Sequence, residues 1–173
     1  MRISILGAGN MGGAIFNHLC RRKEFELALI DPKIDKIWKS LDKSSKVKPP
    51  LLFKDLLQYT QNLKQQKTIL VLAIKPTQLF SLYEEIKISK NLSFDNFLIV
   101  SVVAGISIST LRKIFKTNSI VRAMPNTPVT MGQGMTGLYI PKNIQTKNRE
   151  NVLTIFESLG KTLIVNSEKK LHS

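Results

Sequence analysis

Short runs of apolar residues alternate along the chain with longer segments in which apolar side chains recur three and four positions apart. The runs TILVLAI and FLIVSVV are apolar almost throughout, which is typical of strands buried on both faces of a parallel sheet. The pattern predicts strands at Ile3–Leu6, Glu26–Ile30, Thr68–Ile74, Phe97–Val103, Ser119–Ala123, Leu138–Ile140 and Thr162–Val165. It predicts helices at Met11–Arg22, Ile34–Leu41, Leu51–Leu63, Leu79–Ile88, Ser109–Phe115 and Glu150–Leu159. A further strand between the second and third of these helices is too faint to predict.

This regular alternation of strands and helices predicts an α/β fold. Strands that are separated by helices pair in parallel, so we expect a Rossmann-type, doubly wound, mainly parallel sheet with helices on both faces. A chain of 173 residues is long enough for one domain of this kind. We expect the domain to span residues 1–166 and residues 167–173 to form a tail.

The composition is that of an ordinary globular protein. Hydrophobic residues make up 43% of the chain, and no apolar run approaches the roughly 20 residues needed to cross a bilayer. The first residues run straight into a strand and lack the features of a secretory signal. The single cysteine, Cys20, cannot form an internal disulfide, and its place on the apolar face of a predicted helix indicates a core residue. We therefore expect a soluble, cytoplasmic protein with no membrane partner.

The net charge of +14 raises the question of nucleic-acid binding, because a strongly basic domain is attracted to phosphate backbones. The lysines are scattered through every segment, without interleaved aromatic residues or a basic stripe along one helix. We interpret them as solvated surface residues and expect no nucleic-acid partner.

A glycine cluster stands between the first strand and the first helix. Gly7, Gly9 and Gly12 form the pattern G-x-G-x-x-G. In dinucleotide-binding folds the first glycine allows a tight turn, the second lets the backbone approach a pyrophosphate, and the third lets the helix pack close to the sheet. N–H groups at the start of the helix attract the negative charge. Asp31 ends the next strand, 19 residues beyond Gly12, where a carboxylate accepts a hydrogen bond from an adenosine ribose hydroxyl.

The residues around Asp31 leave the choice between NADH and NADPH open. A carboxylate repels the 2′-phosphate of NADPH and so favours NADH, whereas Lys33 and Lys36 offer that phosphate a partner. Both lysines also fit the simpler interpretation of exposed helix residues.

Three further stretches follow the carboxyl ends of predicted strands, which is the edge where open α/β sheets bind ligands. They are AIKP at Ala73–Pro76, VVAG at Val102–Gly105 and MPNTP at Met124–Pro128. A proline or glycine that ends a strand or turns the chain explains any one of them, but three at one edge favour a shared site. Apolar Ala73 and Val103 suit a flat nicotinamide ring, and Lys75 and Asn126 are candidates to orient its amide or a substrate group.

The sequence contains no Ser/His/Asp set and no Cys/His spacing typical of a metal site. We interpret His18 as a residue of a helix face rather than as an acid–base group. The sequence therefore assigns no catalytic residue and no metal.

Four stretches taken together resemble the amino-terminal half of pyrroline-5-carboxylate reductases. They are GAGNMGGAI, AIKPTQ, SVVAGIS and VRAMPNTPVTMGQGMTGLY, in this order and at similar spacing. The resemblance covers nearly the whole chain, and the combination of the last three stretches is highly specific. It implies hydride transfer to the C=N bond of 1-pyrroline-5-carboxylate, which forms L-proline in the last step of proline biosynthesis with NADPH or NADH.

The resemblance also implies which residues bind. The residues implied to hold the cofactor are Leu6, Gly7, Ala8, Gly9, Asn10, Met11 and Gly12 at the pyrophosphate, Asp31 and Lys33 at the ribose, and Ala73, Ile74, Lys75, Pro76, Val102, Val103 and Ala104 at the nicotinamide. Those implied to lie near the substrate are Lys75, Met124, Pro125 and Asn126. A protonated imine needs little further activation, so positioning of the hydride donor supplies much of the rate and no acid–base residue is required in this half.

Family members continue, after a segment like Ile164–Ser173, into a helical domain that contacts the substrate carboxylate and forms the dimer. Compared with them, we expect the chain to be a truncated, cofactor-binding half that is weak or inactive alone, with its own oligomeric state open. The stretch Ser44–Lys67 is longer and more polar than expected, so contacts with the adenine stay unassigned. Two alternatives remain: a related Rossmann reductase of another imine or of a hydroxy acid, and a non-catalytic nucleotide-binding module.

Overall fold

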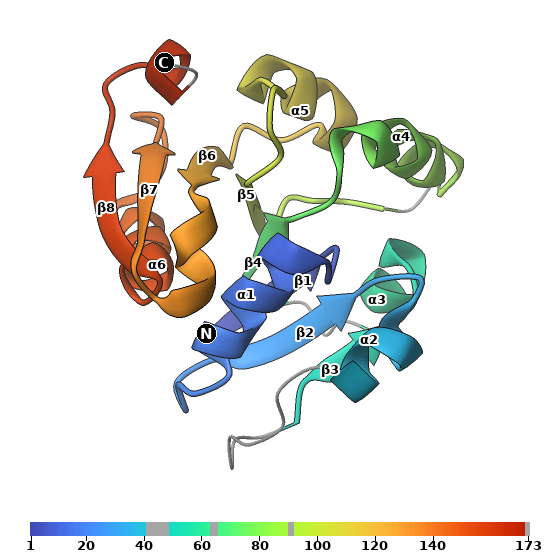
Figure 1. The fold of residues 1–173 in the computed structure, drawn as a ribbon. Helices are drawn as coiled ribbons and strands as arrows, with labels where there is room; N and C mark the ends of the chain where they lie inside the picture. The colour runs from blue at the N-terminus through green and yellow to red at the C-terminus, as the bar shows by residue number, and fades with distance from the viewer. Residues whose placement is uncertain (41–48, 63–65, 90–91, 172–173) are drawn as a thin grey trace.

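The computed structural model describes residues 1–40, 49–62, 66–89 and 92–171, and these residues form one sheet with helices on both faces (Figure 1). The strands are β1 Arg2–Leu6, β2 Glu26–Ile30, β3 Leu51–Phe53, β4 Thr68–Leu72, β5 Phe97–Ser101, β6 Ile120–Pro125, β7 Gly134–Tyr139 and β8 Gly160–Ile164. They lie in the order β3-β2-β1-β4-β5-β6-β7-β8. Each neighbouring pair is parallel except β6 and β7, which are antiparallel. The predicted doubly wound, mainly parallel sheet is confirmed.

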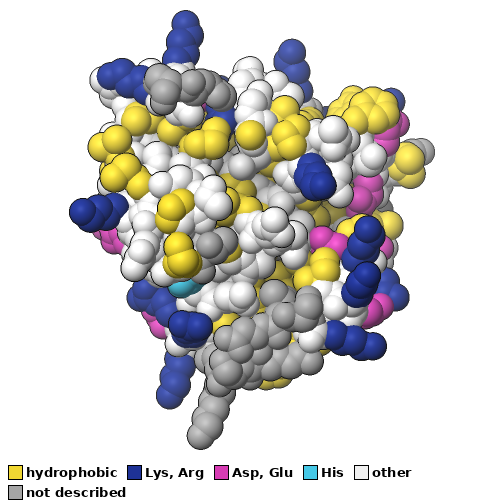
Figure 2. Space-filling view, viewed as in Figure 1, with side chains coloured by type: hydrophobic (Ala, Val, Ile, Leu, Met, Phe, Trp, Pro, Cys, Tyr) yellow, Lys and Arg dark blue, Asp and Glu magenta, His cyan; other side chains and the backbone are white. Residues whose placement is uncertain are grey.

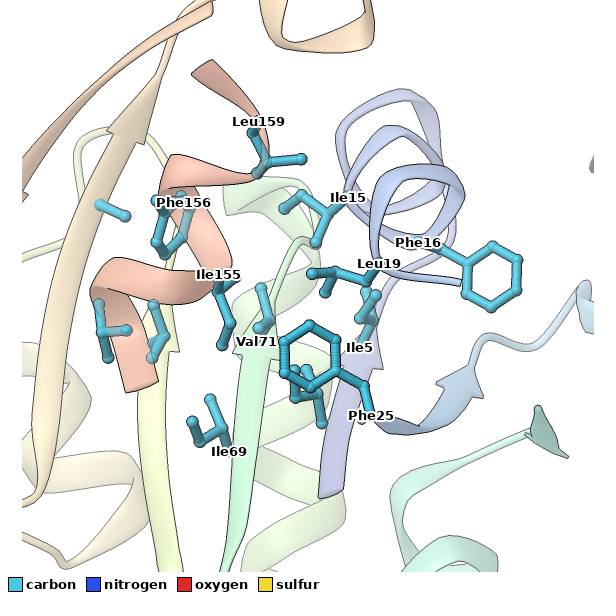
Figure 3. Packing of buried hydrophobic residues seen from close by; sticks show 14 of the residues in the cluster. Ile5, Ile15, Phe16, Leu19, Phe25, Ile69, Val71, Ile155, Phe156 and Leu159 are labelled. Carbon is cyan, nitrogen blue, oxygen red and sulfur yellow. The ribbon is translucent and has the colours of Figure 1, made fainter. Parts of the chain in front are cut away.

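The helices cover the sheet in two groups. The α-helices are α1 Asn10–Leu19, α2 Ile34–Ser40, α3 Leu56–Gln61, α4 Leu79–Ile88, α5 Ile108–Phe115 and α6 Thr146–Glu157, and short 3₁₀ turns are η1 Pro76–Gln78, η2 Thr127–Met131 and η3 Glu168–Leu171. Helices α1, α2 and α6 share one hydrophobic cluster with the sheet, and α3, α4 and α5 share the other. In the first cluster, Ile15 and Leu19 of α1 and Ile155 of α6 lie around Val71 of β4 (Figure 3). Cys20 is buried in the same cluster, which confirms its predicted core role.

The helix predicted at Leu51–Leu63 is wrong in its first part. Residues 51–53 form β3, which pairs in parallel with β2, and α3 begins only at Leu56. Asp55 separates the two elements, because its carboxylate accepts a hydrogen bond from the Gln58 N–H (2.7 Å) and caps the helix. Three sequence predictions fall wholly or partly outside the described residues: Leu41, Leu63 and the stretch Ser44–Lys67.

Other elements differ from the predicted ones mainly at their ends. β6 continues through Pro125, two residues further than predicted, because it pairs with β7 on its free side. β7 begins at Gly134 rather than within Leu138–Ile140, since its first residues do not form an apolar run. α6 begins at Thr146 rather than Glu150, because its first turn is polar and lacks the apolar spacing on which the prediction rests.

The distribution of basic side chains and the length of the helices bear on whether the chain binds nucleic acid or crosses a membrane. On the face shown in Figure 2, the Lys and Arg side chains are spread around the periphery rather than gathered in a single patch. Among the described residues, no helix combines the length and the apolar composition that a bilayer crossing requires.

Candidate dinucleotide-binding site

The predicted site residues lie at the carboxyl edge of the sheet. β1 and β4 are neighbours in its middle, yet the chain proceeds from β1 to β2 and β3 on one side and from β4 to β5 and β6 on the other. Loops diverge at such a switch point and leave a crevice that binds ligands in open α/β sheets. The glycine loop follows β1 and Ala73–Pro76 follows β4, so these two stretches meet at the switch point.

The glycine loop packs so closely that two of its positions have no room for a side chain. Gly7 has a φ of +93°, and a Cβ added to it would lie 2.7 Å from the Ala73 carbonyl oxygen. A Cβ on Gly12 would lie 1.9 Å from the Gly7 carbonyl oxygen. A Cβ on Gly9, in contrast, would meet no other atom of the described residues within 4 Å. Contacts within the protein therefore require Gly7 and Gly12, whereas the space beside Gly9 is open to a ligand.

Helix α1 begins at this open space. Gly9 is its N-cap residue and provides no side-chain cap, and the first turn carries no acidic residue. The first N–H groups of an α-helix have no carbonyl partner within the helix, and the helix dipole places partial positive charge there. The loop and the helix start thus offer hydrogen-bond donors and positive potential to an anion such as a pyrophosphate.

Asp31, at the end of β2, is tied directly to the glycine loop. Its Oδ2 atom accepts a hydrogen bond from the Ala8 N–H (2.9 Å), and its Oδ1 atom accepts one from the Lys33 N–H (2.8 Å). The backbone N–H of Asp31 donates to the Phe53 carbonyl oxygen (3.0 Å). The acidic residue and the glycine loop that were predicted from their spacing are therefore in contact.

The loops after β4 and β5 extend the same edge. The Ala73 N–H donates to the Leu6 carbonyl oxygen (2.8 Å), and the Val102 N–H donates to the Leu72 carbonyl oxygen (3.0 Å). These bonds continue the ladders between β1, β4 and β5 beyond the strand ends. The loop that starts at Ala73 therefore lies beside the end of β1, and the loop that starts at Val102 lies beside the end of β4.

Side-chain exposure separates the residues of these loops into two kinds. Lys75, Pro76 and Ala104 are exposed, and Ile74 is partly buried. Val103 is 1% exposed and packs in the core, so any contact that it makes with a ligand is through its backbone. Sequence reasoning assigned Val103 a ring-facing side chain and missed this burial.

Asn126 follows β6 and has a structural contact of its own. Its Oδ1 atom accepts a hydrogen bond from the Met135 N–H (2.8 Å), and its backbone N–H donates to the Met135 carbonyl oxygen (3.1 Å). Met124 and Pro125 are partly buried just before it, in the last two positions of β6. The side-chain oxygen of Asn126 thus helps to hold the β6–β7 pair together, which leaves its amide NH₂ as the donor to offer a ligand.

The chain then turns back over α1. η2 contacts α1, and a Cβ on Gly132 would lie 3.0 Å from Cε1 of His18. His18 therefore packs beside the loop that follows MPNTP, consistent with its interpretation as a residue of the helix face.

Sequence reasoning overlooked an ion pair with a buried arginine at this end of the sheet. Arg122 of β6 is fully buried, and its Nη1 atom lies 3.2 Å from Oε1 of Glu168 in η3. The same Glu168 oxygen accepts a hydrogen bond from the Ile108 N–H (2.7 Å) at the start of α5. The signal in the sequence was the single charge within the apolar strand IVRAMP, and its partner lies 46 residues further on.

A cavity of about 510 Å³ lies at the opposite edge, around the amino ends of β4 and β5. Its lining includes Lys67, Asp95, Asn96, Asn143 and Lys147, and none of the predicted site residues. The switch point is the better candidate for the dinucleotide, because the glycine loop, the helix start and Asp31 meet there.

Comparison with known proteins supports this assignment. Residues 2–105, more than half of the chain, match the family described as "NADP oxidoreductase coenzyme F420-dependent". The chain is 34% identical over 106 residues to the pyrroline-5-carboxylate reductase of Haemophilus influenzae, a match that covers 61% of the chain and 38% of that protein.

Solved structures give the same picture over a longer stretch. A pyrroline-5-carboxylate reductase from Coxiella burnetii superposes with a TM-score of 0.76 at 25% identity, covering 98% of this chain and 60% of that one. The Plasmodium falciparum pyrroline carboxylate reductase with NADP bound gives a TM-score of 0.71 at 23% identity, covering 99% of this chain and 59% of that one. These matches confirm the resemblance inferred from the sequence motifs. The chain spans less than two thirds of the length of each of these proteins.

Proposed function

The chain belongs to the family described as NADP oxidoreductase, coenzyme F420-dependent, and from this premise we propose that it is the NAD(P)H-binding part of a pyrroline-5-carboxylate reductase. The reaction would reduce the C=N bond of 1-pyrroline-5-carboxylate, adding a hydride to carbon and a proton to nitrogen to form L-proline. The observation that carries the proposal is the open space beside Gly9. Gly9 is the N-cap of α1, and the residue before it, Ala8, donates the hydrogen bond to Asp31. Curated relatives named for this reaction support the choice of substrate.

The residues of the crevice fit a nicotinamide dinucleotide. N–H groups at the start of α1 are available to the pyrophosphate, and the Asp31 carboxylate is available to a ribose hydroxyl. When bound, the dinucleotide supplies the hydride. We propose that Ala73–Pro76 and Val102–Ala104 orient its nicotinamide end, and that Met124–Asn126 border the substrate.

In this proposal the chain raises the reaction rate by holding the hydride donor close to the imine carbon. We assign no acid–base residue, because a protonated imine accepts a hydride once donor and acceptor are held together. The exposed Lys75 ammonium is a candidate to orient the substrate carboxylate or the nicotinamide amide.

We further propose the limits of the binding unit. Residues 1–166 form the dinucleotide-binding domain, and the segment 167–173 that follows is attached to it through Glu168 of η3. The relatives are longer than this chain. We propose that the part of them that it does not span supplies further substrate contacts and the contacts for oligomerisation. The proposal therefore includes weak turnover by the 173-residue chain alone, and a cytoplasmic setting for the reaction.

The proposal is tested by titrating the purified chain with NADH and with NADPH and following nicotinamide fluorescence. We expect saturable enhancement with at least one of them. Gly9→Val should weaken binding at least about tenfold, because the new side chain occupies the space beside Gly9, where an added Cβ has no contact within 4 Å from the rest of the fold.

A matched control is Gln145→Val, which changes the uncapped N-cap residue of α6 at the opposite edge of the sheet. This variant should bind as the wild type does. The proposal fails if a folded wild-type chain binds neither nucleotide, or if Gly9→Val binds unchanged. Rapid turnover of 1-pyrroline-5-carboxylate by the chain alone would refute the part of the proposal that concerns weak activity.

A further inference from the structure

The Asp31 carboxylate is fixed in place by backbone groups on two sides. The Ala8 N–H binds one of its oxygens (2.9 Å) and the Lys33 N–H binds the other (2.8 Å). The backbone of Asp31 is held as well, because its own N–H donates to the Phe53 carbonyl oxygen. A rotation of the side chain away from the glycine loop would break both carboxylate bonds at once.

This arrangement determines whether a ribose 2′-hydroxyl or a 2′-phosphate can lie beside the carboxylate. Each carboxylate oxygen has two lone pairs, so each can still accept one hydrogen bond after binding a backbone N–H. A ribose 2′-hydroxyl can donate such a bond. A 2′-phosphate offers a second anion at the same place, and the fixed carboxylate cannot swing aside to make room for it.

We propose that the fixed Asp31 carboxylate makes this site selective for NADH over NADPH. The inference rests on the proposed function, since it concerns the ribose end of the same crevice. The relatives differ in this respect, since the family is named for NADP and the Plasmodium falciparum enzyme was solved with NADP bound.

Lys33 and Lys36 are the groups that oppose this preference. Both side chains are exposed at the start of α2, where solvent screens their attraction to a phosphate. Holding a long lysine side chain against a ligand also costs conformational entropy, whereas the Asp31 carboxylate is already ordered. We therefore expect the carboxylate, held by two backbone N–H groups, to outweigh the two exposed ammonium groups.

The test compares the dissociation constants of NADH and NADPH for the full 173-residue chain at about 0.15 M salt, where the general attraction of a basic protein for anions is screened within about 8 Å. We expect NADH to bind about tenfold more tightly or better, the range of one hydrogen bond to a charged group. Displacement of bound NADH by ADP and by 2′,5′-ADP should give the same order without any contribution from the nicotinamide. Equal binding, or tighter binding of NADPH, would overturn the inference while leaving the proposed function intact. Failure of both dinucleotides to bind would overturn the two together.

Two variants identify the residue responsible. Asp31→Asn keeps an acceptor for one backbone N–H but removes the charge, and it should bring the two dissociation constants to within about threefold of each other. Asp35→Asn removes a nearby exposed charge, that of the Lys54–Asp35 pair, and should leave the preference as it is in the wild type. A wild-type preference for NADH that survives in Asp31→Asn would assign selectivity to another group and refute the role of Asp31.

Discussion

The buried phenol of Tyr59 in α3 makes the free energy of unfolding depend on pH in the alkaline range. Its side chain is fully buried, its hydroxyl shares a hydrogen bond with that of Ser4, and burial raises the pKa of the phenol above 10.0. In the unfolded chain the phenol ionises near pH 10. The stability that it contributes is therefore complete below that pH and is lost as the pH rises through the higher pKa of the folded state.

We expect the difference in unfolding free energy between the wild type and Tyr59→Phe to decrease between about pH 9 and about pH 11. Phe keeps the packed ring and cannot ionise, so only the titration of the hydroxyl is removed. Urea denaturation at constant ionic strength measures the difference at each pH. Two stability curves that run parallel over this range would contradict the assignment.

Individual site residues could be predicted from the sequence where their contacts are local. The glycine spacing and the position of Asp31 follow from one strand–helix–strand unit, and the Ala8–Asp31 bond joins its two ends. Asn126 is different, because its contact with Met135 depends on an antiparallel pairing that periodicity does not reveal. The burial of Val103 likewise depends on packing from outside its own loop.

Elements were predicted well where a strand is buried on both faces and less well at the sheet edge. β1, β4 and β5 are buried throughout, so apolar residues predominate in their sequences, with Arg2, Ser4, Thr68 and Ser101 as the polar exceptions. β3 is three residues long and partly exposed, and its leucines lie at a spacing that also fits one continuous helix with α3. Asp55 was the signal that separates them, since an N-cap residue marks where a helix begins.

The turn η3 is attached to the sheet by Glu168, which joins three elements. Its Oε1 atom binds Arg122 of β6 (3.2 Å) and the Ile108 N–H of α5 (2.7 Å), and the Arg122 side chain is fully buried. We expect Glu168→Ala to lower the free energy of unfolding by about 2 kcal/mol, because the buried Arg122 guanidinium loses a partly exposed carboxylate and the Ile108 N–H loses its acceptor. Urea denaturation monitored by circular dichroism measures the loss.

The matched control for this prediction is Asp35→Ala. It breaks the Lys54–Asp35 pair (3.2 Å), in which both side chains are exposed, and should cost less than about 1 kcal/mol. Glu168→Gln keeps an oxygen for the Ile108 N–H and should lie between the wild type and Glu168→Ala. If Glu168→Ala were no more harmful than Asp35→Ala, the pair would not hold η3 to the sheet.

At the scale of the whole molecule, the order of strands and helices was sufficient to predict the layers and the edge that carries the site. Right-handed crossovers between parallel strands leave few ways to arrange such a chain, and the switch point between β1 and β4 follows from them. Contacts such as Arg122–Glu168 could not be predicted, because they join segments that only the completed sheet brings together.

The charge balance also acts on the molecule as a whole. Lys and Arg number 26 against 12 Asp and Glu, so the folded chain carries a net charge of +14 whose mutual repulsion is larger in the compact state than in the unfolded one. Salt screens this repulsion over about 30 Å at 0.01 M and about 10 Å at 0.1 M. We expect the thermal midpoint to rise by about 3 °C between about 0.01 M and about 0.3 M NaCl, equivalent to about 1 kcal/mol for a chain of this size.

Calorimetry in NaCl measures this midpoint. Chloride is preferred to sulfate, because sulfate also strengthens the burial of apolar surface and is an anion of the kind that helix starts such as that of α1 attract. A midpoint that falls with NaCl would mean that attractive ion pairs, rather than net repulsion, dominate the electrostatics of the fold.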